Sequence, residues 1–442
     1  MNGRSTLARI ARLSAAFVCS NLARAVIGFA LSLVLGRGLG AERFGGWILC
    51  TTWASMVTVA ADLGFGVLLT RDGARADTDP GGLLGAALIL RVTLASALAI
   101  ALAIAAPALT DRPELIAGLR LAALLGLAGA TYGCFGSLLR SQPRWLPLVL
   151  GIETTWLAAQ VGASWWIVRR GGGIAPLLGV SMATQLAEIA TAMLLWKPVF
   201  GDRVAPHRPA PLLATLRRAA PFAVTGLVAN LQARIAPLML GYLAAPTELG
   251  YFGAASRVGR VARLTPSAIF AGALPVLSHE YTRDRDDAQR VSRTLDRILL
   301  STALCGAAGA LVFAAPLMRI VFGPSFTAAA PTLVWVAIGL VPALSNSSRK
   351  IFLYAAGRET TVVAWSLVAV TLEIGAAMVL IPVGGSTGAA ISVAVGEAAI
   401  WMPLRRAADP QVGTRGLGDW PAKKTPIRSR KPRAASPSPQ VP

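Results

Sequence analysis

The stretch AAPFAVTGLVANLQARIAPLMLGYLAAPTELGYF (residues 219–252) decides the fold, because it reads as an apolar helix and the tight turn into a second one. The hairpin continues to Tyr281. Polar residues lie inside both helices: Asn230, Gln232 and Arg234 in the first, and Arg257, Arg260 and Arg263 in the second. An arginine at the centre of a membrane helix costs about 2.5–3.5 kcal/mol on insertion scales, so these side chains are expected to face a bundle interior or a water-filled cavity.

The arginines of the second helix predict a cationic surface. At about 100° per residue they form a slanted stripe that spans roughly 120° of the helix. A cavity lined in this way favours an anionic ligand. For Arg263, nearest the predicted cytoplasmic end, the alternative is a side chain that snorkels to the membrane interface.

Composition places the chain among polytopic helical membrane proteins. Hydrophobic residues make up 55% and charged residues 14% of the chain, and the mean hydropathy is +0.60. The apolar blocks are long enough to cross a hydrocarbon core, which takes about 20 helical residues. The net charge of +21 does not indicate nucleic-acid binding, because the basic residues gather at helix ends and in a C-terminal tail.

We predict an all-α polytopic membrane protein of about 12 transmembrane helices, in two pseudo-symmetric six-helix lobes around a central cationic cavity. The spans are expected at 13–36, 46–68, 82–107, 115–138, 146–168, 174–196, 219–244, 249–275, 298–321, 328–354, 361–382 and 386–404. The predicted domains are an N-terminal lobe with its connecting loop (1–218), a C-terminal lobe (219–405) and a disordered basic cytoplasmic tail (406–442). Lysine and arginine predominate on one side of the spans, which predicts that both termini are cytoplasmic.

An internal repeat relates the two halves. LGRGLGAERFGGW (35–47) and LGYLAAPTELGYF (240–252) each join the first two helices of a half, so that Gly45 matches Gly250 and Gly36 matches Gly241 at a spacing of 205. An asparagine and an arginine also share one helix face in each half: Asn21 and Arg24 in the first, Asn230 and Arg234 in the second. Six helices per half give both repeats the same topology, as in transporters whose halves rock around a central site.

Several short stretches occur in a fairly specific order along the chain: LGRGLGAERFGGW, DLGFG (62–66), ELGYFGAASRVGRV (248–261), ALPVLSHEY (273–281), IVFGPSFTAAAP (320–331) and STGAA (386–390). In these stretches the sequence resembles the multidrug/oligosaccharidyl-lipid/polysaccharide exporter superfamily, and within it the polysaccharide (Wzx-type) flippases. The resemblance implies a V-shaped, MATE-like bundle that works by alternating access. It also implies that a polyprenyl-diphosphate-linked oligosaccharide, the repeat unit of an O-antigen, capsule or exopolysaccharide, moves from the inner to the outer leaflet.

A lipid-linked diphosphate needs cationic partners inside the membrane. Arginine suits it, because the planar guanidinium can bind two oxygens at once. The resemblance and the charges together predict the substrate-binding residues: Arg24, Arg234, Arg257 and Arg260 on the diphosphate, Asn21, Asn230 and Gln232 on phosphate or sugar, and Arg91 nearer the cytoplasmic rim.

The acids expected inside the membrane are Asp62, Glu153, Glu188, Glu373 and Glu397. Glu373 and Glu397 are candidates for coupling to a proton or sodium gradient. The alternative makes each acid a structural partner of an arginine, because buried charges need partners. No cofactor or metal site is expected, since the four cysteines form no CxxC pair.

Other functions are also compatible with the sequence. A multidrug or small-molecule antiporter of the same superfamily is the nearest, although its usual cationic substrates favour an acidic or aromatic cavity. A flippase for a peptidoglycan precursor would also need a cationic cavity, because its substrate has an anionic headgroup. That family commonly has more helices than the twelve predicted for this chain. A membrane glycosyltransferase or polymerase would need a general acid and base, and no such pair is apparent, so we do not expect an enzyme.

The expected location is the bacterial cell (inner) membrane. The expected partners are the lipid bilayer, a polyprenyl-diphosphate-linked glycan and possible further proteins of polysaccharide assembly, with no nucleic acid among them.

Overall fold

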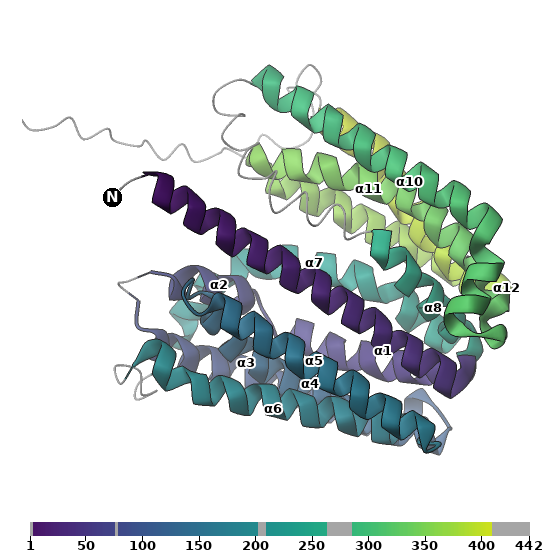
Figure 1. Cartoon of the computed structure of the whole chain (residues 1–442), viewed down its shortest axis with the longest axis horizontal. Helices are drawn as coiled ribbons and strands as arrows, with labels where there is room; N and C mark the ends of the chain where they lie inside the picture. The colour runs from purple at the N-terminus through teal and green to yellow at the C-terminus, as the bar shows by residue number, and fades with distance from the viewer. Residues whose placement is uncertain (1–2, 76–77, 202–208, 263–284, 409–442) are drawn as a thin grey trace, which may run out of the picture.

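The computed structural model describes residues 3–75, 78–201, 209–262 and 285–408, and every regular element in these ranges is a helix (Figure 1). The elements are α1 (Gly3–Ala60), α2 (Phe65–Gly73), α3 (Pro80–Leu109), α4 (Pro113–Arg140), α5 (Leu146–Arg169), α6 (Ile174–Phe200), α7 (Leu212–Leu243), α8 (Pro246–Ala262), α10 (Arg285–Phe322), the 3-10 helix η2 (Pro324–Ala329), α11 (Ala330–Ala355) and α12 (Glu359–Ala408).

Two long helices are each bent into two arms at a glycine. Gly40 in α1 (φ 72°) and Gly385 in α12 (φ 51°) have positive φ, which glycine adopts without the steric penalty of a Cβ. The first arm of α1 holds the first predicted span, and the second arm holds residues 46–60 of the second, which continues into α2. The arms of α12 hold the last two predicted spans. The expected all-α bundle is therefore confirmed.

By length and composition, eight of the described helices can cross a membrane. Helix α7 is not among them, nor is α8, of which 17 residues are described. These are the two helices of the arginine hairpin, and their polar side chains need protein or water around them within a bilayer.

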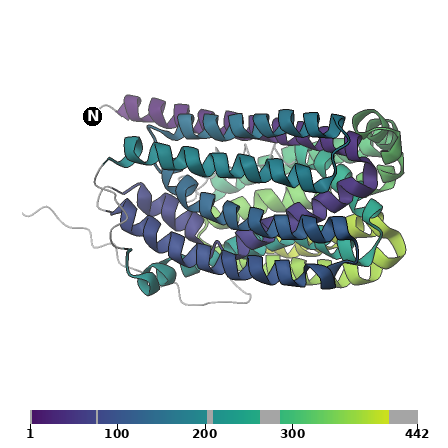
Figure 2. The ribbon, with the colours of Figure 1, turned by 90° about the horizontal axis from the view of Figure 1, so that it is seen from below.

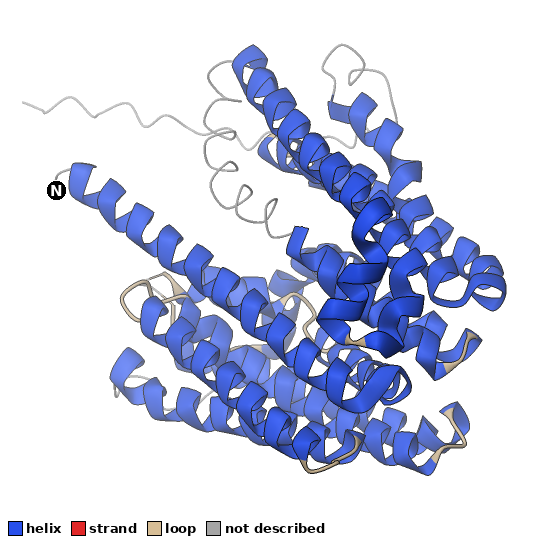
Figure 3. Cartoon of the chain, turned by 45° about the vertical axis from the view of Figure 1, so that its right-hand side comes forward, coloured by secondary structure: helices blue, strands red, loops and turns tan. Residues whose placement is uncertain are grey.

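The helices form two groups with three helices between them. Helices α3, α4, α5 and α6 pack together, as do α10, α11 and α12, while α1, α7 and α8 lie between (Figure 1). Figure 2 shows the helices running side by side along the long axis. The groups meet at the end where α1 and α12 bend, called the far end, and diverge toward the end where the chain begins (Figures 1 and 3).

The two halves are joined at the far end by a reciprocal helix crossing. A Cβ at Gly45, in the second arm of α1, would lie closer than 3.0 Å to the carbonyl oxygen of Pro246 in α8. A Cβ at Gly250 would lie equally close to the carbonyl oxygen of Ala41. Ala41 and Pro246 are related by the same repeat spacing as the two glycines, so the halves touch through equivalent surfaces. Buried aromatic rings pack around the crossing: Phe44, Trp47, Phe322 and Phe326.

Helix α7 contacts both groups. Near its start, Ala219 packs in an apolar cluster with Phe65 of α2, and Arg218 forms an ion pair with the fully buried Asp72. Helix α7 also packs against α12. The predicted division between residues 218 and 219 thus falls inside a helix that bridges the two groups, and the division itself stays a prediction. Of the predicted tail, residues 406–408 end α12, and the rest lies outside the described residues.

The crossing predicts an unusual response to alanine. In a helix interior, Gly→Ala normally stabilises by about 1 kcal/mol. At Gly45 and Gly250 the added Cβ must push two backbones apart, and we expect a loss of about 1–3 kcal/mol, as for other overpacked sites. Thermal unfolding in detergent, followed by tryptophan fluorescence, measures the change. The matched control is Gly162→Ala in α5, where a Cβ meets nothing within 4 Å. Equal effects at all three positions would contradict the close crossing.

Candidate substrate cavity

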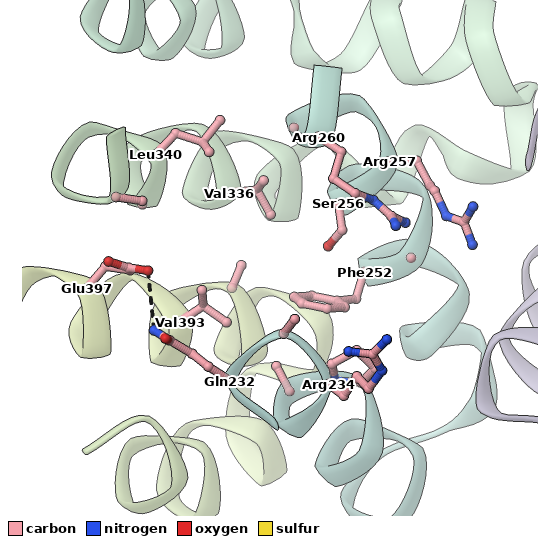
Figure 4. A pocket seen from close by; sticks show the side chains of 18 of the residues that line it. Gln232, Arg234, Phe252, Ser256, Arg257, Arg260, Val336, Leu340, Val393 and Glu397 are labelled. Carbon is pink, nitrogen blue, oxygen red and sulfur yellow. Dashed lines mark hydrogen bonds between the residues drawn. The ribbon is translucent and has the colours of Figure 1, made fainter. Parts of the chain in front are cut away.

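A cavity of about 890 Å³ lies where the second arm of α1 meets α7, α8, α11 and α12. Trp47, Phe252 and Tyr354 contribute aromatic rings to a wall that is otherwise aliphatic and polar. The polar and charged lining comprises Thr51, Thr52, Ser55, Gln232, Arg234, Ser256, Arg257, Arg260, Ser347, Lys350, Tyr354, Ser366 and Glu397. Figure 4 shows the arginine side chains of α7 and α8 on one side and the Gln232–Glu397 pair on the other.

The lining is cationic in balance. Among the described residues that line the cavity, Arg234, Arg257, Arg260 and Lys350 are basic and Glu397 alone is acidic. The central cationic cavity expected from the sequence is therefore confirmed. Sequence reasoning missed Lys350 as a lining residue, because it follows Arg349 near the end of a predicted span and reads as an orientation-setting charge.

Arg257 is held by a neutral partner and an aromatic ring. Its Nη1 donates a hydrogen bond to Ser32 Oγ in the first arm of α1 (2.7 Å). Its guanidinium carbon lies 5.7 Å from the centroid of the Trp47 ring, within the range of a cation–π contact. Both partners come from α1, so Arg257 links α8 to the first half of the chain.

Arg234 has the same kind of surroundings. Its Nε donates to Ser55 Oγ in the second arm of α1 (2.7 Å). Its Nη1 donates to the backbone oxygen of Asn230 (3.0 Å) and to Asn230 Oδ1 (2.9 Å). Among the described residues, no carboxylate lies within salt-bridge distance of Arg234 or Arg257. Their hydrogen-bond acceptors are hydroxyl, amide and carbonyl oxygens.

Arg260, one turn after Arg257 on α8, also lines the cavity and is exposed. Figure 4 shows its side chain on the same side as those of Arg234 and Arg257. The hairpin thus brings three of its predicted arginines to one wall. Arg263, the fourth, lies outside the described residues.

The opposite wall holds a carboxylate bound by amides. Glu397 is 7% exposed, and its Oε1 accepts a hydrogen bond from Gln232 Nε2 (3.3 Å). Asn346 Nδ2 donates to Glu397 Oε2 (2.9 Å) and to its backbone oxygen (2.8 Å). Sequence reasoning missed Asn346, although the polar run SNSS (345–348) within an apolar span is a usable signal. Glu373, the other candidate for coupling, is fully buried and does not line the cavity.

Arg24 lies outside the cavity lining. It forms an ion pair with Glu153, whose side chain is 2% exposed and also accepts hydrogen bonds from Arg140 Nη1 (2.6 Å) and the Tyr132 hydroxyl. The sequence placed Arg24 and Arg234 at equivalent positions, yet Arg24 pairs with an acid of its own half, whereas no acid among the described residues pairs with Arg234. Asn21, on the same exposed part of α1, lines neither of the cavities described here.

Arg91 and Asn230 line a second, smaller cavity of about 150 Å³, next to the break between α1 and α2. The Arg91 residue is 2% exposed, and its Nη2 lies 3.0 Å from Asp62 Oδ1. For Asp62 and Glu153, the alternative reading of the acids as structural partners of arginines therefore fits the geometry. Among the described residues, no group of three or more His, Cys, Asp or Glu side chains is placed to hold a metal ion.

The Glu153 cluster predicts a stability effect. Glu153→Gln removes the charge that separates Arg24 from Arg140 and leaves two cations with little compensation. Because both arginines are partly exposed to solvent, we expect a loss of about 1–3 kcal/mol, the range for hydrogen-bonded groups that lose their partner. The control is Glu42→Gln, which breaks an exposed pair with Arg112 and should change stability by less than about 1 kcal/mol. The thermal unfolding temperatures of both variants test this expectation. Equal, small decreases in the two unfolding temperatures would contradict a structural role for Arg24.

The sequence matches the family described as polysaccharide biosynthesis protein over residues 11–281. A search of curated proteins gave no match.

Solved structures share the fold. An inward-facing multidrug resistance MATE family transporter of the MOP superfamily has 13% identity and a TM-score of 0.73, covering 88% of this chain and 95% of that chain. An outward-facing transporter of the same description has 16% identity and a TM-score of 0.64, covering 92% and 96%. The lipid II flippase MurJ, in an inward closed conformation, has 13% identity and a TM-score of 0.66, covering 88% and 86%. At these identities the likeness concerns the fold, and it confirms the expected MATE-like architecture.

Proposed function

This chain belongs to the polysaccharide biosynthesis protein family, and we propose that it is a flippase for a polyprenyl-diphosphate-linked oligosaccharide. The lipid-linked glycan would move from the inner to the outer leaflet of the bacterial cell membrane, with both termini of the protein cytoplasmic. Family and fold make the chain a multi-pass membrane protein of a transporter superfamily. The substrate and the direction are the proposal.

One observation carries the choice of substrate: the large cavity has an excess of basic side chains, and the hydrogen-bond acceptors of Arg234 and Arg257 among the described residues are neutral. Charges removed from water need compensation, and a diphosphate supplies about two negative charges with several acceptor oxygens. Charge-assisted bonds to such oxygens are roughly twice as strong as bonds between neutral groups. An anionic headgroup therefore complements this wall better than any neutral ligand.

The size of the cavity agrees with a headgroup rather than a whole lipid. Its volume of about 890 Å³ falls within the range of roughly 300–1,000 Å³ that is usual for small-molecule sites. We assign the diphosphate to Arg234, Arg257 and Arg260, and the adjoining sugars to the hydroxyl groups of Ser347 and Tyr354 on α11. The polyprenyl chain would stay in the bilayer. Arg24 and Arg91, which have acid partners, are not assigned to the ligand.

A flipping assay tests the proposal. We expect proteoliposomes with the wild-type protein to move a fluorescent polyprenyl-diphosphate oligosaccharide across the bilayer. Arg257→Gln and Arg234→Gln should each slow this movement about tenfold or more, because each removes a charged hydrogen-bond donor worth about 1.5–3 kcal/mol. The flipping rate of Arg257→Lys should lie between those of the wild type and Arg257→Gln, since lysine keeps the charge but lacks the paired N–H donors of the guanidinium. Accessibility of the headgroup to a membrane-impermeant reagent gives the rate.

The control for this assay is Arg112→Gln, at an exposed pair with Glu42 that does not line the cavity. It should flip like the wild type. Transport of organic cations in place of the glycolipid would support the multidrug branch of the superfamily instead. Normal flipping by the folded arginine variants would make those arginines structural.

We further propose that Glu397 couples transport to a proton or sodium gradient. It is the acid that lines the cavity, and its described partners are amides rather than cations. Glu397→Gln should make the flipping rate insensitive to an imposed pH or sodium gradient while leaving headgroup binding within about twofold. A rate that still follows the gradient in this variant, but not in Glu373→Gln, would move the coupling to Glu373. Glu42→Gln serves as the control and should respond like the wild type.

A further inference from the structure

Two serines of α1 accept hydrogen bonds from the arginines that are proposed to bind the headgroup. Ser55 Oγ accepts from Arg234 Nε, and Ser32 Oγ accepts from Arg257 Nη1, each at 2.7 Å. Each serine donates its own proton back to its helix, Ser55 to the Thr52 carbonyl (2.7 Å) and Ser32 to the Gly28 carbonyl (2.9 Å). The serine oxygens thus act as pure acceptors toward α7 and α8. We call these two contacts the serine latch.

The latch and a phosphate group compete for the same donors. In Arg234, Ser55 holds Nε and Asn230 holds Nη1, so each two-donor edge of the guanidinium has a nitrogen already engaged. On Arg234, a phosphate that binds bidentately through Nε replaces Ser55, and one that binds through Nη1 replaces Asn230. On Arg257, a phosphate that binds bidentately through Nη1 replaces Ser32. A phosphate oxygen is a stronger acceptor for a guanidinium than a serine hydroxyl is.

The latch also ties the two halves of the chain together. Its serines belong to the two arms of α1, and its arginines belong to the hairpin of α7 and α8. Other cross-contacts nearby do not share a donor with a ligand in the cavity: Arg37 Nε donates to the Val321 carbonyl (2.8 Å), and Trp53 Nε1 donates to the Tyr242 hydroxyl (2.6 Å). The serine latch is the part of this set that an occupant of the cavity can break.

We propose that Ser32 and Ser55 are positioning residues of a ligand-released latch: the diphosphate displaces them from Arg257 and Arg234, and α1 then separates more easily from the hairpin at the far end. The inference rests on the proposed function, because it presumes an anionic headgroup in this cavity. Thermodynamic linkage determines whether removal of the latch raises or lowers the affinity for the ligand. If the ligand weakens the latch, the formed latch must weaken binding of the ligand by the same factor, so removing the latch must strengthen binding.

The binding experiment uses the purified full chain and two soluble probes, farnesyl diphosphate and inorganic pyrophosphate. We expect Ser55→Ala and Ser32→Ala to bind farnesyl diphosphate about three- to tenfold more tightly than the wild type, the range expected for loss of one competing hydrogen bond. Arg234→Gln and Arg257→Gln should bind it more weakly. If the protein recognises only the phosphates, the variants should rank in the same order of affinity for pyrophosphate, each binding it more weakly than farnesyl diphosphate. No binding of pyrophosphate would show that the lipid portion is required.

The matched control is Thr51→Val. Thr51 also lines the cavity on α1, but among the described residues its hydroxyl bonds to carbonyls of its own helix, those of Trp47 (2.9 Å) and Ile48 (3.1 Å). Its affinity should equal that of the wild type. Should an alanine variant fail to fold, Ser55→Cys and Ser32→Cys replace it, because a thiol keeps most of the volume but is a weak acceptor.

A distance measurement tests the release itself. Spin labels at Asp111→Cys and Ser325→Cys, both exposed at the far end and on opposite halves, are added after the exposed Cys19 and Cys305 are changed to serine. We expect farnesyl diphosphate to shift the label distances toward longer values. The double variant Ser32→Ala/Ser55→Ala should show the longer distances without ligand, and Thr51→Val should not.

The outcomes separate the latch from the function. Serine variants that bind the probe with unchanged or weaker affinity overturn the latch, while binding by the wild type keeps the proposed function. No binding of farnesyl diphosphate by the wild type, together with no flipping, overturns the function and the latch with it. Tighter binding without any change in the label distances also overturns the latch as a device that holds the halves together.

Discussion

The close crossing of α1 and α8 is the constraint on which the rest of the architecture depends. Gly45 and Gly250 allow two helix backbones to approach more closely than any residue with a Cβ permits. The crossing closes the bundle at the far end and sets the positions of both arms of α1 against the arginine hairpin. Trp47 and Ser55 on α1, and Arg257 on α8, reach the same cavity because their helices diverge from this point.

Charge pairing then divides the arginines into two kinds. Arg24 and Arg91 meet Glu153 and Asp62, so their charges are largely compensated within the first half of the chain. Arg234 and Arg257 meet hydroxyls, an amide and a π face instead. Such neutral partners orient a guanidinium without cancelling its charge, and the positive potential remains available to a ligand.

The fold alone does not choose the substrate. The same bundle occurs in solved structures described as multidrug transporters and in one described as a lipid II flippase. What distinguishes members of a shared fold is the polarity of the site, and here the lining carries four basic residues against one acid. The serine contacts show that two of these cations are also hydrogen-bonded to α1, so the arginines of the hairpin contact the first half of the chain.

The sequence by itself determined the helical class, the spans, the internal repeat and the presence of arginines that a membrane interior does not tolerate without partners, because hydropathy and spacing are local properties. It also identified Gly45 and Gly250 as equivalent. Only the tertiary structure decided that these glycines touch each other's helices, that Arg24 meets an acid whereas its repeat counterpart Arg234 does not, and that Lys350 and Asn346 belong to the cavity or its support. Those outcomes depend on which side chains the packing brings within a few ångströms, and no spacing along one chain encodes that directly.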